Sequence, residues 1–137
     1  MAKESGLGLS VQVDDSAGTL RNISNDITNL QWAIPSEVQD VTGVDKSARE
    51  RLHLLADFSV TLNGVFNDAT NMSHAVLKNY RTLASGQSGR TVTITHSGQT
   101  LSCETLFTDY SMSREAGGGL TWSAPGQLAD GTIPAWS

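Results

Sequence analysis

The chain has 137 residues, of which 38% are hydrophobic and 17% are charged, with a formal net charge of −5 and a single cysteine. Fourteen acidic residues against nine basic ones exclude a protein that holds nucleic acid on a basic surface, and one cysteine excludes an internal disulfide framework. The length predicts one domain over residues 1–137. Because the polar start of the sequence has no apolar run, we expect no signal peptide and no membrane span, and a protein that is made in a cytoplasm.

The N-terminal third of the chain predicts a flexible arm followed by short strands. Residues 1–8 hold two glycines and little to bury, so we expect them to be mobile in the free subunit. Alternating apolar residues predict strands over 9–13 and 30–34, the first ended by the polar turn at 14–18 and the second by a proline. The isoleucines of residues 21–29 have helical spacing that Asn and Ser interrupt, so this segment stays ambiguous.

Two interpretations are open for residues 43–55. The segment before them, 37–42, is weakly strand-like through its two valines. Residues 43–55 then form either an ordered loop or a short helix capped by Asp45, with the charged half in solvent and the leucines inward. The sequence alone does not decide between the two.

The clearest pattern of the chain lies in residues 55–81, where a strand pattern is followed by a helix pattern. The apolar residues of the first half share one face of a strand: Phe58, Val60, Leu62 and Phe66. This alternation predicts a half-buried strand. From Met72 to Tyr80 the apolar spacing becomes three to four residues, which predicts a helix with Asn71 as its N-cap.

The C-terminal part predicts a hairpin and a final strand. Residues 90–96 and 100–110 both alternate, and the Ser97-Gly98 pair between them is typical of a tight hairpin turn. A triple-glycine turn leads to a last strand at 120–124, and the tail from 129 to 137 is expected to pack down. Six or seven strands with one helix predict a mainly β fold, a small antiparallel sandwich or barrel.

Residue types that usually carry chemistry are scattered along the chain. His53, His74 and His96 fall in three different predicted elements, without the spacing of a metal site. Cys103 takes the inward phase of a strand, where a nucleophile would be poorly exposed. We therefore expect no catalytic residues, no metal, no cofactor and no enzymatic activity.

Three segments carry a resemblance to a known family: QDVTGVDKSARERLHLLADFSVTLNGVFND (39–68), NMSHAVLKNYR (71–81) and LFTDYSMSREAGGGLTWSAPGQLADGTIPAWS (106–137). With these the chain resembles the short major tail tube proteins of long-tailed, siphovirus-like bacteriophages, over residues 6–137. The resemblance implies a β-sandwich of the phage tail tube type with a flanking helix. It also implies six subunits that close into a ring by sheet-to-sheet pairing, and rings that stack head to tail into a hollow tube.

The same resemblance implies a virion protein that is assembled in the cytoplasm of the bacterial host and works as the conduit for DNA ejection. DNA would pass through the lumen without specific binding. Six copies at −5 would give a ring charge of about −30, and repulsion screened within about 8 Å would keep DNA off the wall without barring its passage. The implied protein partners are further copies of the chain, the tape measure, the terminator and the tail tip.

A long loop that reaches the adjacent ring is also implied by the resemblance, and residues 43–51 match it best. The candidate inter-ring contacts are Asp45, Lys46, Arg49, Glu50 and Arg51. The alternative, a solvated amphipathic helix on the same subunit, stays open. Reversal of the three basic residues to Glu is predicted to abolish tube growth and to leave a folded monomer.

The polar phases of two predicted strands are the candidates for the lumen wall. They are Ser59, Thr61 and Asn63 of one strand, and Thr91, Thr93 and Thr95 of another. The outside of the tube is an equally suitable place for some of them, because hydroxyl and amide side chains tolerate water anywhere.

Other functions remain open at this stage. A tail terminator or a head–tail joining ring protein would share much of the fold but stop at one ring. A carbohydrate-binding β-sandwich would need Trp32, Trp122 or Trp136 exposed together, whereas two of the three lie in the apolar phase of strands, which favours core packing.

Overall fold

The computed structural model describes residues 3–137 and is mainly β, with ten strands and one short α-helix. The strands are β1 (Ser10–Asp14), β2 (Leu20–Asn22), β3 (Ile27–Ala33), β4 (Ser36–Asp40), β5 (Arg51–Ala56), β6 (Ser59–Val65), β7 (Arg90–His96), β8 (Gln99–Phe107), β9 (Ser111–Arg114) and β10 (Leu120–Leu128). The helical segments are the 3₁₀ turn η1 (Ser24–Asp26) and α1 (Ser73–Leu77). The expected antiparallel β fold with one helix is confirmed, although with more strands than the six or seven predicted.

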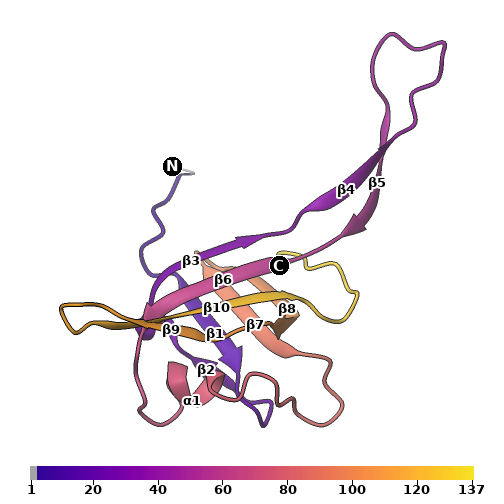
Figure 1. Ribbon diagram of the computed structural model, residues 1–137. Coiled ribbons are helices and arrows are strands. Elements are labelled where there is room, and N and C mark those ends of the chain that lie inside the picture. Colours follow the sequence, from indigo (N-terminus) through magenta and orange to yellow (C-terminus); the bar gives the residue numbers. More distant parts are fainter. Residues whose placement is uncertain (1–2) are drawn as a thin grey trace.

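Eight of the strands form one antiparallel sheet in the order β2-β1-β7-β8-β10-β6-β3, with β9 paired to β10. Figure 1 shows that this sheet folds over itself into two layers whose strands cross. One layer holds β3, β6, β10 and β9, and the other holds β2, β1, β7 and β8. The remaining strands, β4 and β5, make a separate two-stranded hairpin that projects from the body.

The hydrophobic core lies between the two layers because alternate residues of each strand point inward. Val60 and Leu62 of β6 are at most 1% exposed, and so are Val92 and Ile94 of β7 in the opposite layer. Trp122 of β10 is also buried. Further core residues are Val11, Val13, Ile23, Phe58, Leu101, Phe107 and Ala124, with Val76 and Leu77 of α1.

The predicted hairpin between β7 and β8 is confirmed, and its turn has the expected chemistry. Ser97 and Gly98 have φ of 51° and 78°, the positive values that a two-residue type I′ turn requires. Seven residue pairs then run in register from Arg90 with Thr105 to His96 with Gln99. Local sequence therefore fixes this part of the sheet.

Strand β10 changes its partner on one side along its length. Residues 120–123 pair with β9 and residues 126–128 pair with β8. Pro125 lies between the two partners, where its carbonyl accepts a hydrogen bond from the Thr108 N–H at 3.0 Å. The proline nitrogen faces the same side and has no N–H to donate. Because the strand changes partners at this point, no strand hydrogen bond is lost, and a proline is accommodated in a central strand.

Helix α1 is shorter than the apolar spacing predicts, and its N-terminus is different. The helix covers Ser73–Leu77, with Met72 at the N-cap position and Asn71 in the left-handed region at φ of 65°. The Asp26 carboxylate accepts from the Ser73 N–H at 3.0 Å and from the Asn67 side chain at 2.8 Å. A residue far away in the sequence thus replaces the local cap that we expected.

Arg90 of β7 is buried and joins α1 and the residues after it to β1, a strand of its own layer. Its guanidinium donates to the backbone carbonyls of Asp14 and Val76, each at 2.8 Å, of Asn79 at 2.7 Å, and of Thr82 at 2.9 and 3.0 Å. The side chain is 1% exposed. Burial lowers its pKa, and two nearby aspartates oppose that shift. All five N–H groups of the guanidinium are therefore used on backbone carbonyl groups, which belong to β1, to α1 and to the residues after α1.

The bounds of several strands differ from the prediction. The ambiguous segment 21–29 divides among β2, η1 and β3. The strand predicted over 100–110 ends at Phe107, and β9 was not predicted. The tail packs down as expected, because Ser137 exchanges two backbone hydrogen bonds with Thr100.

Candidate assembly surfaces

The most prominent surface feature is the β4–β5 hairpin, residues 36–56, which we call the arm. It prolongs β3 and β6 beyond the body of the protein, as Figure 1 shows. Strands β4 and β5 pair antiparallel, with an irregularity between Ser36 and Val38. None of the 21 residues of the arm is buried. A hairpin of this length gains little from its own packing, so it needs a further contact surface.

Residues 43–55 form an ordered loop followed by a strand, and the helical alternative is wrong. The Thr42 hydroxyl accepts from the Glu50 N–H at 2.8 Å, and the Val41 N–H donates to the Glu50 carbonyl at 2.9 Å. These bonds close the tip of the hairpin and keep residues from Arg51 onward extended. Cross-strand pairing with β4 therefore prevails over the helical spacing of the apolar residues.

The charged residues of the arm tip are partly paired within the arm. Arg49 forms an ion pair with Asp40 at 2.6 Å, and Lys46 lies 4.0 Å from Asp45. The hydroxyl and N–H of Thr42, followed by Arg49, lower the pKa of Asp40. Among the sequence-predicted inter-ring candidates, Glu50 and Arg51 lie where the loop meets β5 and are exposed. The five candidates thus lie together at the tip, away from the body.

The sequence prediction missed the apolar side chains of the arm. Of the arm residues, six large hydrophobic ones are exposed: Val38, Val41, Val44, Leu52, Leu54 and Leu55. Leu52 is 56% and Leu54 is 48% exposed, and both belong to the same phase of β5. Such a concentration on a hairpin that contributes nothing to the core marks a contact surface for another molecule.

The six candidate lumen residues do not form one surface. Ser59, Thr61 and Asn63 of β6 alternate with core residues and lie on the outer face of the β3-β6-β10-β9 layer. The polar residues of β7 lie on the outer face of the opposite layer, where Thr93 pairs with Ser102 of β8. The core separates the two faces, so a lumen can be lined by only one of these sets.

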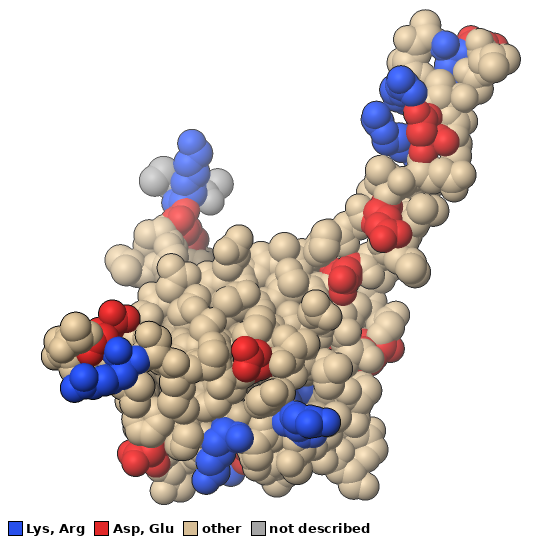
Figure 2. Space-filling model, in the orientation of Figure 1, with Lys and Arg blue, Asp and Glu red and all other residues tan. Residues whose placement is uncertain are grey.

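The outer face of the β3-β6-β10-β9 layer, which we call the neutral face, is polar but uncharged. The strand register brings its side chains together: Asn29, Gln31, Ser59, Thr61, Asn63, Ser111, Ser113, Thr121, Ser123 and Gln127. Arg114, at the end of β9, is the only charged residue in these four strands. In Figure 2 the surface over β3, β6 and β10 is mainly tan, and most coloured groups lie on the arm, on the β9–β10 hairpin and along the lower edge.

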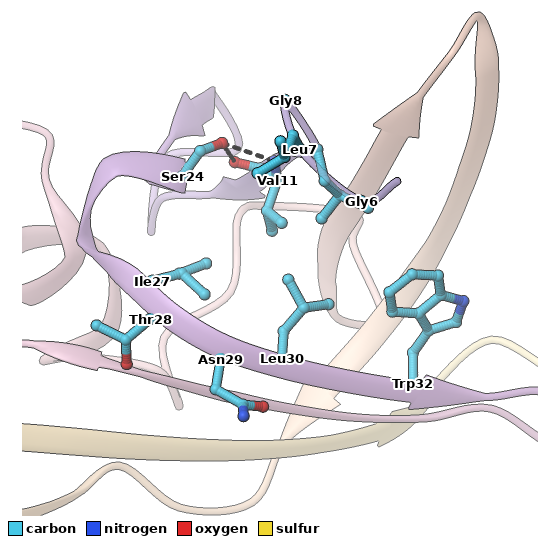
Figure 3. A pocket seen from close by; sticks show the side chains of 11 residues that line it. Gly6, Leu7, Gly8, Val11, Ser24, Ile27, Thr28, Asn29, Leu30 and Trp32 are labelled. Atoms are coloured by element: carbon cyan, nitrogen blue, oxygen red, sulfur yellow. Dashed lines mark hydrogen bonds between the residues drawn. The ribbon is translucent and has the colours of Figure 1, made fainter. Parts of the chain in front are cut away.

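The layer that carries the neutral face has a strand without a second partner at each side. Within residues 3–137, β3 pairs only with β6, and β9 pairs only with β10. An open groove of about 500 Å³ runs beside β3, under the N-terminal segment. Figure 3 shows Leu30 pointing into it and the hydrogen bond at 2.7 Å from the Val11 N–H to the Ser24 hydroxyl at its far side. The edge of β3 is therefore accessible to another strand.

The three histidines, which the sequence analysis considered as metal ligands, do not come together. His53 lies on the arm, His74 contacts Tyr110 and His96 bonds the Ser5 carbonyl. No three His, Cys, Asp or Glu side chains within residues 3–137 are grouped as a metal site would need. No helix of that part of the chain is long and apolar enough to span a membrane.

The three tryptophans do not form a common platform. Trp122 is buried, and its indole N–H donates to the Val65 carbonyl at 2.8 Å. Trp32 and Trp136 lie together, with ring centroids 6.2 Å apart, and Trp136 is 46% exposed. The expectation of core packing is confirmed for Trp122, which therefore cannot belong to an exposed platform, and Trp32 and Trp136 are the two tryptophans that lie side by side.

The N-terminal segment described by the structure, residues 3–8, is exposed and has no helix or strand. Its Ser5 carbonyl lies 2.7 Å from the His96 ring nitrogen. Residues 1–2 of the expected flexible arm lie outside the described residues, and the mobility of 3–8 stays a prediction.

Neither a protein-family model nor a curated protein matches the chain. Solved structures share its fold, among them two from gene transfer agent particles. A chain from the virion of a native gene transfer agent particle superposes with a TM-score of 0.76 at 15% identity, covering 98% of this chain and 99% of that one. A chain from the tail of an empty gene transfer agent particle, refined with C6 symmetry, gives a TM-score of 0.72 at 17% identity, covering 98% of both. The chain therefore has a fold that occurs in the virion and tail of a phage-like particle.

Proposed function

We propose that the chain is the subunit of a hollow tail tube in a phage-like particle, in which six copies form a ring and rings stack head to tail. The observation that carries this proposal is the arm, an extended hairpin of which no residue is buried and which carries six exposed large hydrophobic residues. The fold shared with a gene transfer agent tail refined with C6 symmetry supports the ring and its sixfold symmetry. The role is structural and needs no catalytic residue.

Ring closure is assigned to the two free edges of the β3-β6-β10-β9 layer. Its neighbouring strands are all antiparallel, so β3 and β9 run in opposite directions. When β9 of one subunit meets β3 of the next, the new pair is antiparallel and the sheet continues without interruption. Six such layers would make a closed barrel without edges.

The neutral face then lines the lumen, because the core covers the other side of the same layer. The outer face of β7 and β8, with Thr91, Thr93 and Thr95, is assigned to the outside of the tube. The tube would conduct DNA during ejection, and its ends would meet the tape measure, terminator and tail tip proteins.

The arm is assigned to the contact between rings. It prolongs the strands of the lumen layer, and about eight extended residues at about 3.3 Å each take its tip some 25 Å beyond the body. Its partner is a second copy of the chain in the adjacent ring. Both the exposed apolar residues and the charged tip residues, Asp45, Lys46, Arg49, Glu50 and Arg51, are available for that contact.

Electron microscopy of the purified protein over a range of concentrations tests the assembly. Long tubes are expected, single rings would favour the terminator or head–tail joining alternative, and particles that stay discrete under all conditions would overturn the proposal.

Cysteine labelling tests the assignment of the faces. In a Cys103→Ser background, Thr61→Cys in assembled tubes should react with a small maleimide but not with a maleimide coupled to a protein of albumin size. Thr93→Cys, the matched control on the opposite face, should react with both. The reverse pattern would show that the lumen assignment is wrong even where tubes form.

A further inference from the structure

We propose that the contact between subunits of a ring has an apolar centre, in which Met112 of one subunit enters the open groove beside β3 of its neighbour and completes the hydrophobic core there. This inference rests on the proposed ring, and it names the side chains that meet in it. The groove and Met112 lie at opposite edges of the β3-β6-β10-β9 layer, so each copy of the chain offers both halves of the contact.

The groove beside β3 is a place where the space between the two layers stays open. Leu30 and Trp32 belong to the core phase of β3, because each pairs with a buried residue of β6. Both pack against the core but stay half-buried, and Figure 3 shows Leu30 pointing into the groove. Within residues 3–137, no strand pairs with the free edge of β3. An apolar side chain placed there by a partner would remove this surface from water.

Met112 is the side chain at the opposite edge that has the matching position. It pairs with the buried Trp122 of β10, so its side chain lies on the core side of the layer. Its neighbours in β9, Ser111 and Ser113, belong to the neutral face. Met112 is 43% exposed although it faces the core side, because β9 is the last strand of the layer. An unbranched, polarizable thioether suits an irregular groove that contains an indole ring.

The register of the strands places the two halves of the contact at the same height. The pairs that cross the layer at this level are Met112 with Trp122, Trp122 with Gly64, and Gly64 with Ile27. When β9 of one subunit pairs with β3 of a neighbour at equal height, Met112 therefore lies beside Ile27, which lines the groove. A shift along β3 toward the arm brings Met112 to Leu30 or Trp32, which belong to the same phase.

Cross-linking of assembled tubes tests the contact, after microscopy has shown that tubes are present. In a Cys103→Ser background, Met112→Cys/Leu30→Cys tubes are treated with a bismaleimide that spans about 8 Å, the distance of diagonal neighbours across two strands. The two positions of one subunit are three strand spacings apart, about 14 Å, so only cysteines of different subunits are joined. Denaturing gels should show a ladder that ends at six subunits. Thr93→Cys/Leu30→Cys is the control and should stay monomeric.

Peroxide oxidation tests the same contact without a substitution. Hydrogen peroxide transfers one oxygen atom to the thioether sulfur and leaves water, and the rate follows the exposure of the sulfur. The sulfoxide of Met112, measured by mass spectrometry, should form about tenfold more slowly in tubes, because the contact reduces its 43% exposure to a few per cent. In Ser102→Met, the added methionine on the outer face of β8 should react equally fast in tubes and in free subunits.

Tubes that yield only monomers after cross-linking, or a ladder that continues beyond six, would overturn this contact and leave the proposed tube intact. Equal oxidation of Met112 in tubes and in free subunits would also overturn it, and this measurement decides if the cysteine variant does not assemble. Failure of the natural protein to form tubes at the microscopy step would instead overturn the proposed function, and this inference with it.

Discussion

Replacement of two leucines on the arm separates assembly from folding. Leu52 and Leu54 are 56% and 48% exposed in the free subunit, and the hydrophobic core contains no residue of the arm, so the two leucines contribute little to the stability of the body. Full burial of a leucine side chain is worth about 1.5–3 kcal/mol, and about half of that remains to be gained at each position. Loss of both should therefore weaken the contact between rings by about 1.5–3 kcal/mol per arm, which corresponds to a ten- to hundredfold higher critical concentration for tube growth.

The assay is sedimentation of tubes over a series of protein concentrations, with urea unfolding of the free subunit measured in parallel. Leu52→Asn/Leu54→Asn should raise the critical concentration by that factor and leave the unfolding midpoint unchanged. Leu52→Met/Leu54→Met is the matched control, since it keeps the apolar area and should assemble normally. A critical concentration within twofold of the natural protein would refute the role of this apolar pair.

Charge reversal at the tip gives a second, distinguishable effect. The arm carries four acidic and three basic residues, so Lys46→Glu/Arg49→Glu/Arg51→Glu changes its net charge from −1 to −7. Tube growth should be lost through repulsion between arms and neighbouring rings, and salt should restore part of it. The defect of the leucine variant should persist at high salt. Equal salt dependence of the two variants would contradict the division between apolar and ionic contacts.

Three further predictions concern the body of the protein. Arg90→Met should reduce the free energy of unfolding by about 3–5 kcal/mol, because four carbonyl groups lose their donor, whereas the exposed control Arg81→Met should change it by less than about 0.5 kcal/mol in urea titrations. Gly64→Ala should cost at least about 2 kcal/mol in the same titration, since an added Cβ would lie 2.7 Å from the Trp122 ring; an unchanged midpoint would contradict this packing. Burial raises the pKa of the Cys103 thiol, so its rate of alkylation should rise at higher pH than in the unfolded chain, and stability should fall as pH rises from the unfolded thiol pKa through the native one. Coincident alkylation curves for the native and unfolded chains would contradict the shift.

Elements that depend on local chemistry could be predicted from the sequence. The hairpin between β7 and β8 follows from alternation and from a Ser97-Gly98 turn that accepts positive φ, and the structure has it in the expected register. The strand β6 is likewise confirmed, apart from Phe66, which was expected inward and is 36% exposed. These elements need no information from distant parts of the chain.

Features that depend on distant contacts could not be predicted in the same way. Helix α1 is capped by Asp26, 47 residues before Ser73, which no local pattern reveals. Strand β9 has the sequence SMSR, without an apolar alternation, and becomes a strand because the glycine turn folds it onto β10. The assignment of Thr61 and Thr93 to different faces needed the order of strands in the sheet, which the alternation of each strand alone does not contain.

The arm leaves the body at one end only, opposite to α1, as Figure 1 shows. A stack of such subunits is therefore polar: one terminus displays free hairpins, and the other displays the surfaces that receive them. Growth at the two ends of the stack need not be equally fast, and a partner protein that binds one end has no matching surface at the other. The direction of the whole filament would thus be set by a single protrusion of 21 residues.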